Sequence, residues 1–412
     1  MWMSLAPPRP PQARPGHVQQ VFSCAPIYDL IFCDLSPRTL VWLSHACRYT
    51  HAAVACFYRR AYNINQHLSR FFSDPLSFRS LQARTGLVIS GSNALQFFDR
   101  TFYPGSDLDL YAHPGHVYEL LEWLESVDYQ FEPSGHQEED WHNHVSADWD
   151  GTVKRTQQEQ AAGGTANALD LSWYPDIAGV YTFKRFAVVD GEFVELKVQV
   201  METTCNPIST IMKFHSTCVM NIITFNAAYS FYPVATFEER AALNIPASKH
   251  NPDVIAKYVK RGWRVFGAFR PRDIMRPRAS PFFANETRWV GDHRCWSIPL
   301  DTSGVKPRPV MSPSSEQFSW DPAIHNGWIM SYSDSSDTGQ KVPFMNAHLI
   351  MTTIFRYNYI FPDEKLALII RGWSRSQGNL NHRSLTKPDW TWFDDEIPRF
   401  REAVELAWAM EF

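Results

Sequence analysis

Asp107 and Asp109 are the residues whose types and spacing best suit chemistry in this sequence. Alternate residues of a β-strand point to the same face, so the two carboxylates would project together while Leu108 and Leu110 face a core. Neighbouring carboxylates repel each other unless a cation lies between them, and Mg²⁺ prefers carboxylate and phosphate oxygens. Residues 107–111 therefore predict an amphipathic strand with a divalent-metal site on its polar face.

A candidate phosphate site lies just upstream. Residues 87–90 predict a short apolar strand, and residues 93–98 predict the helix that follows it. Gly91 at the turn between them lets backbone N–H groups approach a phosphate closely, and Ser92 adds a hydroxyl donor. The start of the helix also favours negative charge. The two segments together predict a phosphate-binding turn beside a metal site.

This arrangement resembles the nucleotidyltransferase (DNA polymerase beta-like) superfamily, whose pattern is a strand, Gly-Ser or Gly-Gly, a helix, and Asp-x-Asp or Asp-x-Glu on the next strand. Gly91, Ser92, Asp107 and Asp109 match this pattern position by position, and the resemblance covers residues 72–232. It extends in particular to fungal proteins with the same Gly-Ser-x-Ala-Leu-Gln-Phe-Phe and Ser-Asp-Leu-Asp-Leu-Tyr signature. The resemblance implies that the carboxylates hold two Mg²⁺ ions, which bridge the triphosphate of a nucleotide and activate an acceptor hydroxyl.

The resemblance also implies a third carboxylate on a later strand, predicted at residues 193–200. The polar residues Glu195, Lys197 and Gln199 alternate with apolar ones there, so they share one face. Gln199 fits the expected position best, and Glu195 would take it only in another strand register. Lys197 is predicted either to neutralise a triphosphate or to form a salt bridge within a hairpin.

The N-terminal helices carry a second resemblance, to the F-box, a short helical motif that docks onto Skp1 in ubiquitin-ligase complexes. Ser36 and Pro37 predict the start of a helix. The resemblance implies that residues 26–55 offer an apolar helix face to the groove of a Skp1 partner. The alternative is a small helical subdomain that packs on the rest of the chain. The matching residues are Ile31, Phe32, Leu35, Pro37, Leu40, Leu43, Cys47 and Arg48. A buried helix face is expected to consist of Ile27, Leu30, Ile31, Phe32 and Leu35.

These elements predict an α+β fold, with a small mixed sheet of a nucleotidyltransferase-like fold flanked by helices and an N-terminal F-box-like helical subdomain. The predicted divisions are a disordered Pro-rich tail at 1–22, the F-box-like segment at 23–68, the nucleotidyltransferase-like domain at 72–245 with a surface insertion at 137–168, and an α+β region of unassigned role at 246–412. Further predicted elements are helices at 51–62, 117–126, 209–227, 253–263 and 397–410, a hairpin of 181–189 with 193–200, and a loop at 307–337.

Composition limits the other possibilities. A formal net charge of −4 over 412 residues provides no basic field that would recruit nucleic acid by counterion release alone. Seven cysteines without C-x-x-C spacing predict reduced thiols rather than a disulfide framework or a zinc site. No stretch reaches the roughly 20 apolar residues of a membrane span, and the N-terminus lacks a signal-peptide pattern. We expect an intracellular protein, cytoplasmic or nuclear, without a membrane partner.

Two functions remain open at this point. One is an enzyme that transfers a nucleotidyl group from a nucleoside triphosphate to an acceptor. The other is a catalytically inert protein of the same fold that acts as an F-box-type adaptor for a Skp1-containing ubiquitin ligase. The candidate catalytic residues are Asp107, Asp109 and Glu195, the metal ligands are Asp107 and Asp109, and the nucleotide-binding residues are Gly91, Ser92, Lys197 and Gln199.

Overall fold

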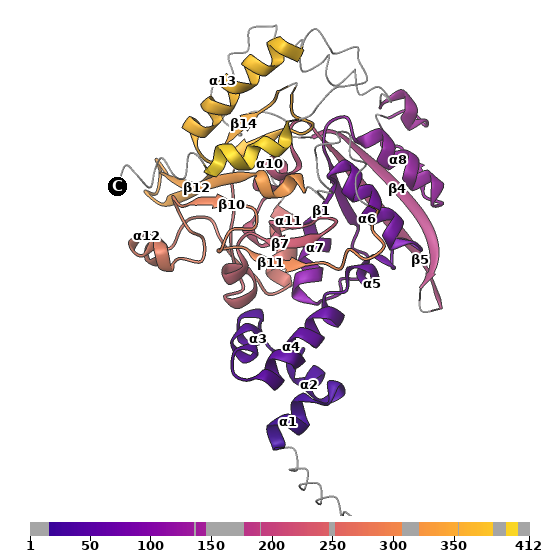
Figure 1. Ribbon diagram of the computed structural model, residues 1–412, viewed down its shortest axis with the longest axis vertical. Coiled ribbons are helices and arrows are strands. Elements are labelled where there is room, and N and C mark those ends of the chain that lie inside the picture. Colours follow the sequence, from indigo (N-terminus) through magenta and orange to yellow (C-terminus); the bar gives the residue numbers. More distant parts are fainter. Residues whose placement is uncertain are drawn as a thin grey trace, which may run out of the picture. The chain divides into compact units, whose positions relative to one another are not determined.

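The computed structural model describes residues 16–135, 137–145, 177–189, 191–246, 252–306, 321–352, 354–381 and 393–402. The chain divides into two compact units, residues 1–63 and 64–412. Figure 1 shows the helices and strands of both units, coloured along the sequence from the N-terminus to the C-terminus. The first unit therefore ends slightly before the predicted F-box-like segment does.

The first unit is helical. It contains α1 (His17–Phe22), α2 (Ala25–Phe32), α3 (Pro37–Ser44) and α4 (Arg48–Ala61). The prediction of disorder is wrong for the residues of α1, and residues 1–15 lie outside the described range. The helix start predicted at Ser36 is confirmed, because the Ser36 side chain accepts the backbone N–H of Thr39 and Pro37 occupies the first turn.

The core of the first unit differs in part from the prediction. Phe32 is buried and Leu35 is half-buried, as predicted, but Ile27, Leu30 and Ile31 are exposed. Tyr28 is buried instead. Tyr28 and Phe32 are four residues apart and so lie on one side of α2, and it is this side that faces the core. The buried cluster consists of Tyr28, Phe32, Leu40, Ala53, Val54 and Phe57.

The second unit is built on an eight-stranded sheet in the order β11-β7-β6-β1-β2-β5-β4-β3. Neighbouring strands are antiparallel, except that β2 and β5 are parallel. The α+β class with a mixed sheet is therefore confirmed, but the sheet is larger than predicted. The strands are β1 (Val88–Ser90), β2 (Leu108–Ala112), β3 (Gln130–Glu132), β4 (Ile177–Val189), β5 (Glu192–Thr203), β6 (Asn221–Ile223), β7 (Ala227–Ser230) and β11 (Trp296–Pro299).

Helices and smaller sheets surround this sheet. α8 packs against β3 and β5, and the apolar residues of β2 and β5 on one face are buried. The helices are α5 (Ile64–Leu68), α6 (Pro75–Thr85), α7 (Gly91–Asp99), α8 (Val117–Ser126), α10 (Pro207–Met212), α11 (Pro252–Lys260), α12 (Pro271–Met275) and α13 (Glu364–Asn381). The other sheets are β10 (Thr287–Trp289) with β12 (Gly327–Asp334) and β13 (Lys341–Asn346), β14 (His348–Ile350) with β15 (Tyr359–Phe361), and β8 (Ala241–Leu243) with β9 (Arg264–Phe266).

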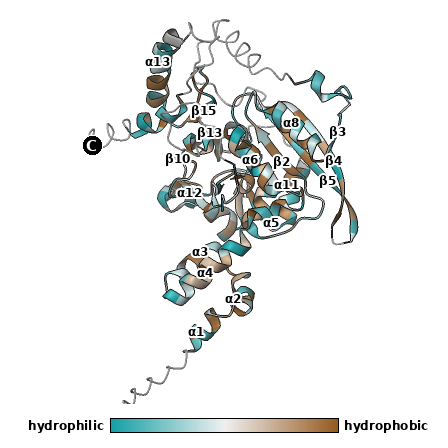
Figure 2. Cartoon of the chain, turned by 45° about the vertical axis from the view of Figure 1, so that its right-hand side comes forward, coloured by the Kyte–Doolittle hydropathy of each residue, from teal (hydrophilic) through white to brown (hydrophobic). Residues whose placement is uncertain are grey.

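Most predicted local elements are present. The hairpin corresponds to β4 and β5, and α8 has the predicted bounds. Hydrophobic and hydrophilic residues alternate along much of β5, whereas β4 mixes them without strict alternation (Figure 2). α4 and α11 match the helices predicted at 51–62 and 253–263, and the helix predicted at 397–410 is described only as far as residue 402.

Two predicted elements are wrong. The helix expected at 209–227 ends at Met212, and β6 follows because its β-branched residues pair with β1, with Ile223 opposite Ile89. The loop expected at 307–337 contains β12, which runs between β10 and β13; residues 307–320 lie outside the described range. Of the predicted surface insertion, only residues 137–145 are described, and they include a short 3-10 helix.

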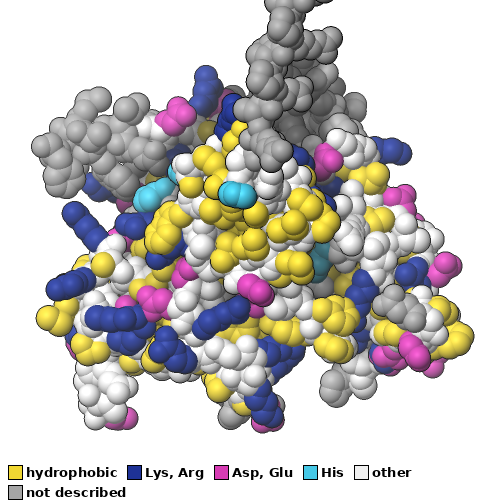
Figure 3. Space-filling view, turned by 90° about the horizontal axis from the view of Figure 1, so that it is seen from below, with side chains coloured by type: hydrophobic (Ala, Val, Ile, Leu, Met, Phe, Trp, Pro, Cys, Tyr) yellow, Lys and Arg dark blue, Asp and Glu magenta, His cyan; other side chains and the backbone are white. Residues whose placement is uncertain are grey.

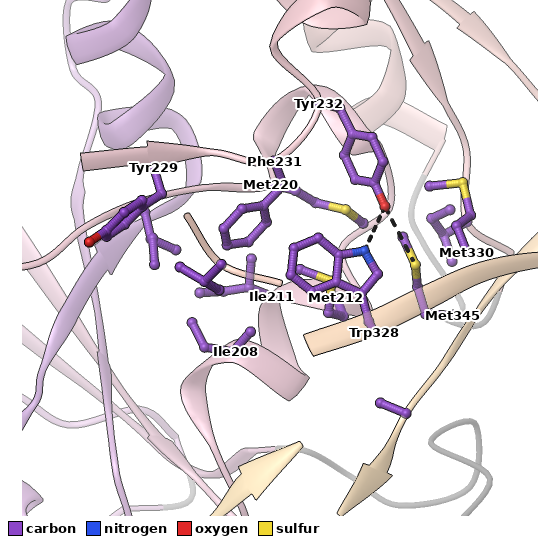
Figure 4. Packing of buried hydrophobic residues seen from close by; sticks show 14 of the residues in the cluster. Ile208, Ile211, Met212, Met220, Tyr229, Phe231, Tyr232, Trp328, Met330 and Met345 are labelled. Atoms are coloured by element: carbon purple, nitrogen blue, oxygen red, sulfur yellow. Dashed lines mark hydrogen bonds between the residues drawn. The ribbon is translucent and has the colours of Figure 1, made fainter. Parts of the chain in front are cut away.

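Residues before and after position 246 share one core, so the predicted boundary there does not separate two units. β11 extends the main sheet by pairing with β7. Trp328 Nε1 donates to Tyr232 Oη at 2.9 Å, and the same hydroxyl lies 3.9 Å from Met345 Sδ (Figure 4). Tyr232 and Trp328 are fully buried, which ties β12 and β13 to the segment after β7.

The described surface carries charged side chains of both signs. Lys and Arg side chains are dispersed among apolar and acidic ones on the face drawn in Figure 3. The seven cysteines are free thiols in the structure. Among the described residues, no helix has the length and apolar character needed to cross a membrane.

Candidate functional site

The turn from β1 into α7 lies against the carboxylate of Asp109. β1 and β2 are antiparallel, and Ser90 at the end of β1 is opposite Asp109. Gly91 follows with φ of +66°, a conformation that favours glycine. A Cβ atom on Gly91 would lie 2.4 Å from Asp109 Oδ2. The glycine is therefore needed both for its backbone conformation and for the space that the carboxylate occupies.

The start of α7 has backbone donors that the preceding side chain does not cap. The Ser90 hydroxyl donates to the backbone oxygen of Asn221 at 2.7 Å and makes no cap hydrogen bond to α7. Ser92 lies in the first turn and is buried, with 7% of its surface exposed. The first N–H groups of a helix have no partner within the helix and suit an anion. The predicted phosphate turn therefore has the required backbone form.

Gln96 joins α7 to the loop that leads into Asp107. Its side-chain nitrogen donates to the Ser92 carbonyl at 3.1 Å and to the Ser106 hydroxyl at 2.8 Å. Its side-chain oxygen accepts the Tyr103 N–H at 2.7 Å. Sequence reasoning missed this role, although a single amide within the apolar run that follows Gly91 was a usable signal.

Asp109 has an unusual protonation equilibrium. Its pKa is raised to about 7, mainly by burial and then by the charge of Asp107, while Lys257 and Lys197 act to lower it. A carboxyl group with such a pKa is partly protonated near neutral pH. A cation bound beside it would favour the ionised form and release the proton.

Lys197 pairs with Asp107 across two strands. β2 and β5 run parallel with Leu108 opposite Val198, so the preceding residues are also neighbours. Lys197 Nζ lies 3.1 Å from Asp107 Oδ2, and each side chain is 31% exposed. Among the described residues, the ion-pair partner of Lys197 is Asp107 and not a residue of the predicted hairpin. The ammonium group therefore contacts one of the two candidate metal ligands.

The strand register decides which residue neighbours Asp109. Gln199 of β5 is opposite Asp109, in the position where the resemblance implies a carboxylate. Glu195 is opposite Phe186 on β4 and pairs with Lys184 at 3.2 Å. Glu195 is four residues from Gln199, about 13 Å along a strand. The structure does not bring Glu195 to the aspartate pair, because the alternative register that this required is not formed.

The supply of metal ligands is correspondingly small. Within the described ranges, no group of three or more His, Cys, Asp or Glu side chains is arranged to hold a metal ion. Asp107 and Asp109 thus provide two carboxylates, and Gln199 provides an amide. This set suits one hard cation that also binds phosphate oxygens better than it suits two ions held by protein carboxylates.

α11 brings positive charge to the same place. The pKa of Lys257 is lowered by partial burial and by Arg261, while Asp109 and Asp107 act to raise it. The Arg261 guanidinium lies 3.6 Å from the ring centroid of Tyr103 and 5.4 Å from that of Tyr258. The two aromatic rings hold Arg261 beside the loop that Gln96 fixes.

Comparisons of the chain with protein-family models, with curated proteins and with solved structures found no match.

Proposed function

We propose that this chain binds a Mg²⁺-nucleotide at Gly91, Ser92, Asp107 and Asp109. The observation that carries the proposal is the contact between the Asp109 carboxylate and the left-handed Gly91, at the start of a helix whose N-terminal N–H groups are not capped by Ser90. This geometry supports a phosphate on the α7 turn and a cation on the two carboxylates. When bound, Mg²⁺ would neutralise phosphate charge between them.

Lys257 and Arg261 are proposed to contact the phosphates farthest from α7. Both are cationic, and Lys257 interacts electrostatically with both aspartates. Arg261 is already ordered by Tyr103 and Tyr258, so it loses less conformational freedom when it binds an anion. Lys197 is proposed to balance the charge of Asp107 when no metal is bound.

In this proposal the nucleotide is bound, and nucleotidyl transfer is absent or very slow. Transfer requires a group that accepts the proton of the acceptor hydroxyl. Gln199 occupies the third position and cannot act as a base, while Glu195 is engaged with Lys184. Gln199→Asp should therefore introduce or increase nucleotidyl transfer, because it supplies a carboxylate opposite Asp109.

Calorimetry and thermal shift with Mg²⁺ and each nucleoside triphosphate test the binding proposal. A ligand present at 100 times its Kd stabilises the folded protein by about 2.7 kcal/mol, which is readily detected. We expect a shift with wild type and none with Asp107→Asn or Asp109→Asn. Glu195→Gln is the matched control, because it also replaces a carboxylate by an amide on the same face of the sheet, but at a distance from Asp107 and Asp109. No shift with any nucleotide in wild type, or an undiminished shift in the aspartate variants, would refute the proposal.

A second candidate function is supported by the surface of the first unit. We propose that α2 and α3 bind Skp1 through apolar side chains that the unit leaves in solvent. Leu30 is 75% exposed and Trp42 is 68% exposed, and Ile27, Ile31 and Val41 are also exposed. Exposed apolar side chains in such number on a small unit are typical of an interaction surface.

Co-purification with Skp1 tests the adaptor proposal. Leu30→Asp with Trp42→Asp should abolish retention of Skp1 without unfolding the unit, since both side chains are exposed. Leu40→Asp is a poor test, because Leu40 is fully buried and its replacement would unfold the unit. Retention of Skp1 by the double variant, or no retention by wild type, would reject the adaptor function.

A further inference from the structure

The long hairpin of β4 and β5 has an edge that the proposed nucleotide site does not use. β3 pairs with β4 only at Thr182, Phe183 and Lys184. β3 is short because Asp128, with φ of +68°, turns the chain as it leaves α8. Among the described residues, no strand continues this pairing along β4 beyond Lys184. The edge of β4 at residues 186–188 is therefore open on the β3 side.

A groove of about 790 Å³ lies where β3 stops, and the open edge forms one of its walls. Its lining includes Asp128, Glu132, Lys184, Phe186 and Glu195. This volume is within the range of roughly 300–1,000 Å³ that is usual for ligand sites. The groove and the edge together offer both main-chain pairing and space for side chains.

The open edge is apolar where natural edge strands are usually charged. Phe186, Val188 and Phe193 are 72%, 61% and 85% exposed. Val188 is opposite Phe193, and Phe186 is two residues from Val188, so the three side chains share one face. At the other end of β4, the Gln137 side chain donates to the Val180 carbonyl at 3.0 Å and covers the edge. Exposed apolar edges invite pairing with another strand.

The charge of the groove indicates which strand would fit. Lys184 is shared between Glu132 at 2.9 Å and Glu195 at 3.2 Å. Arg185 is directed elsewhere, with Nη2 donating to the Phe71 carbonyl at 2.8 Å. The carboxylates of Asp128, Glu132 and Glu195 therefore outnumber the cations that face the groove. A second copy of this chain would bring the same carboxylates to the same edge and be repelled, whereas a cationic strand would be attracted.

We propose that the edge of β4 at residues 186–188 binds an extended polypeptide segment in which basic and apolar residues alternate. The segment adds to the main sheet as a further strand beside β4, with main-chain hydrogen bonds. Its basic side chains lie on the face of Phe186 and Val188, where their aliphatic stems cover these two residues and their charged ends pair with Glu132 and Glu195. Its apolar side chains lie on the other face, beside Ala187. This inference does not depend on nucleotide binding.

Fluorescence anisotropy with the full-length chain and a labelled eight-residue peptide of alternating Lys and Val tests the proposal. Wild type should bind this peptide and should not bind the matching Glu-Val peptide. Glu132→Lys with Glu195→Lys should weaken binding by about 10-fold or more. Glu192→Lys is the matched control, since Glu192 lies on the same hairpin outside the groove lining and should leave the affinity nearly unchanged.

Two further measurements distinguish strand addition from other modes. The Lys-Val peptide with alternate backbone nitrogens methylated keeps its charge but loses main-chain donors, so it should bind at least about 10-fold more weakly. Equal binding of the methylated peptide, no binding of the parent peptide to wild type, or equal effects of the groove and control variants would overturn the proposal. So would sedimentation velocity showing a dimer that Phe186→Lys dissociates, because the occupant of the edge would then be a second copy.

Discussion

Replacing Asp109 by Asn should stabilise the protein at alkaline pH while removing its capacity for metal. Burial and Asp107 raise the pKa of Asp109 from an ordinary value of 3.8 to about 7. The folded state therefore holds the proton more tightly than the unfolded state does, and stability falls as pH rises from about 4 to about 7. Above pH 7 the Asp109 carboxylate is ionised in the folded wild type, and this lowers the free energy of unfolding. The neutral amide in the variant has the same shape and does not lower it in this way.

The magnitude follows from the size of the shift. Each pKa unit corresponds to about 1.36 kcal/mol, so a rise from 3.8 to about 7 corresponds to roughly 4 kcal/mol. Asp109 is partly exposed, and solvent screening reduces the effect, so we expect about 2–3 kcal/mol at pH 8. Near pH 4.5 the wild-type carboxyl is largely protonated in the folded state, and the difference should fall below about 1 kcal/mol.

Urea unfolding of wild type and Asp109→Asn at pH 4.5 and pH 8 measures this difference. Tryptophan fluorescence is a suitable signal, because Trp141, Trp263 and Trp328 are buried in the second unit. Glu192→Gln, at the exposed start of β5, is the control and should change the free energy of unfolding little at either pH. A gain that is equal at both pH values, or no gain at pH 8, would show that Asp109 is not held in an unfavourable ionised state.

Three further outcomes are expected from the same geometry. Gly91→Ala and Gly105→Ala should each lower the free energy of unfolding by about 1–2 kcal/mol, because both positions have positive φ. Only Gly91→Ala should also abolish Mg²⁺-nucleotide binding in calorimetry, since its Cβ would displace the Asp109 carboxylate. Gly105 is the control, because nothing lies within 4 Å of a Cβ there. Lys197→Met should raise the affinity for Mg²⁺ alone by about 3-fold or more, because it removes the cation on Asp107; an unchanged affinity would contradict competition between the ammonium group and the metal. Gln96→Leu should weaken nucleotide binding by about 10-fold through the loss of its three hydrogen bonds to the loop and to α7, and an unchanged affinity would remove Gln96 from the site.

Local sequence patterns accounted for the parts of the site that depend on a few adjacent residues. The two-residue spacing of Asp107 and Asp109 predicted a strand with both carboxylates on one face. In the structure Asp107, just before β2, and Asp109 are partly exposed, while Leu108 and Leu110 are buried. The glycine-serine turn, the hairpin and α8 were predicted from turn chemistry and periodicity. These features are set by backbone conformation and side-chain alternation, which act over a few residues.

The tertiary structure alone decided which distant residues meet. The parallel pairing of β2 with β5 places Gln199 opposite Asp109 and leaves Glu195 with Lys184, although all three polar residues of β5 share one face. The same pairing puts Lys197 on Asp107. About 90 residues separate the two paired positions along the chain. Burial of the apolar face of β5 fixes this register, because a shift of one residue would expose that face. The tertiary structure also placed β11 in the main sheet. Within the helix predicted at 209–227, residues of β6 pair with β1 and β7, so that strand pairing outweighs local helix propensity there.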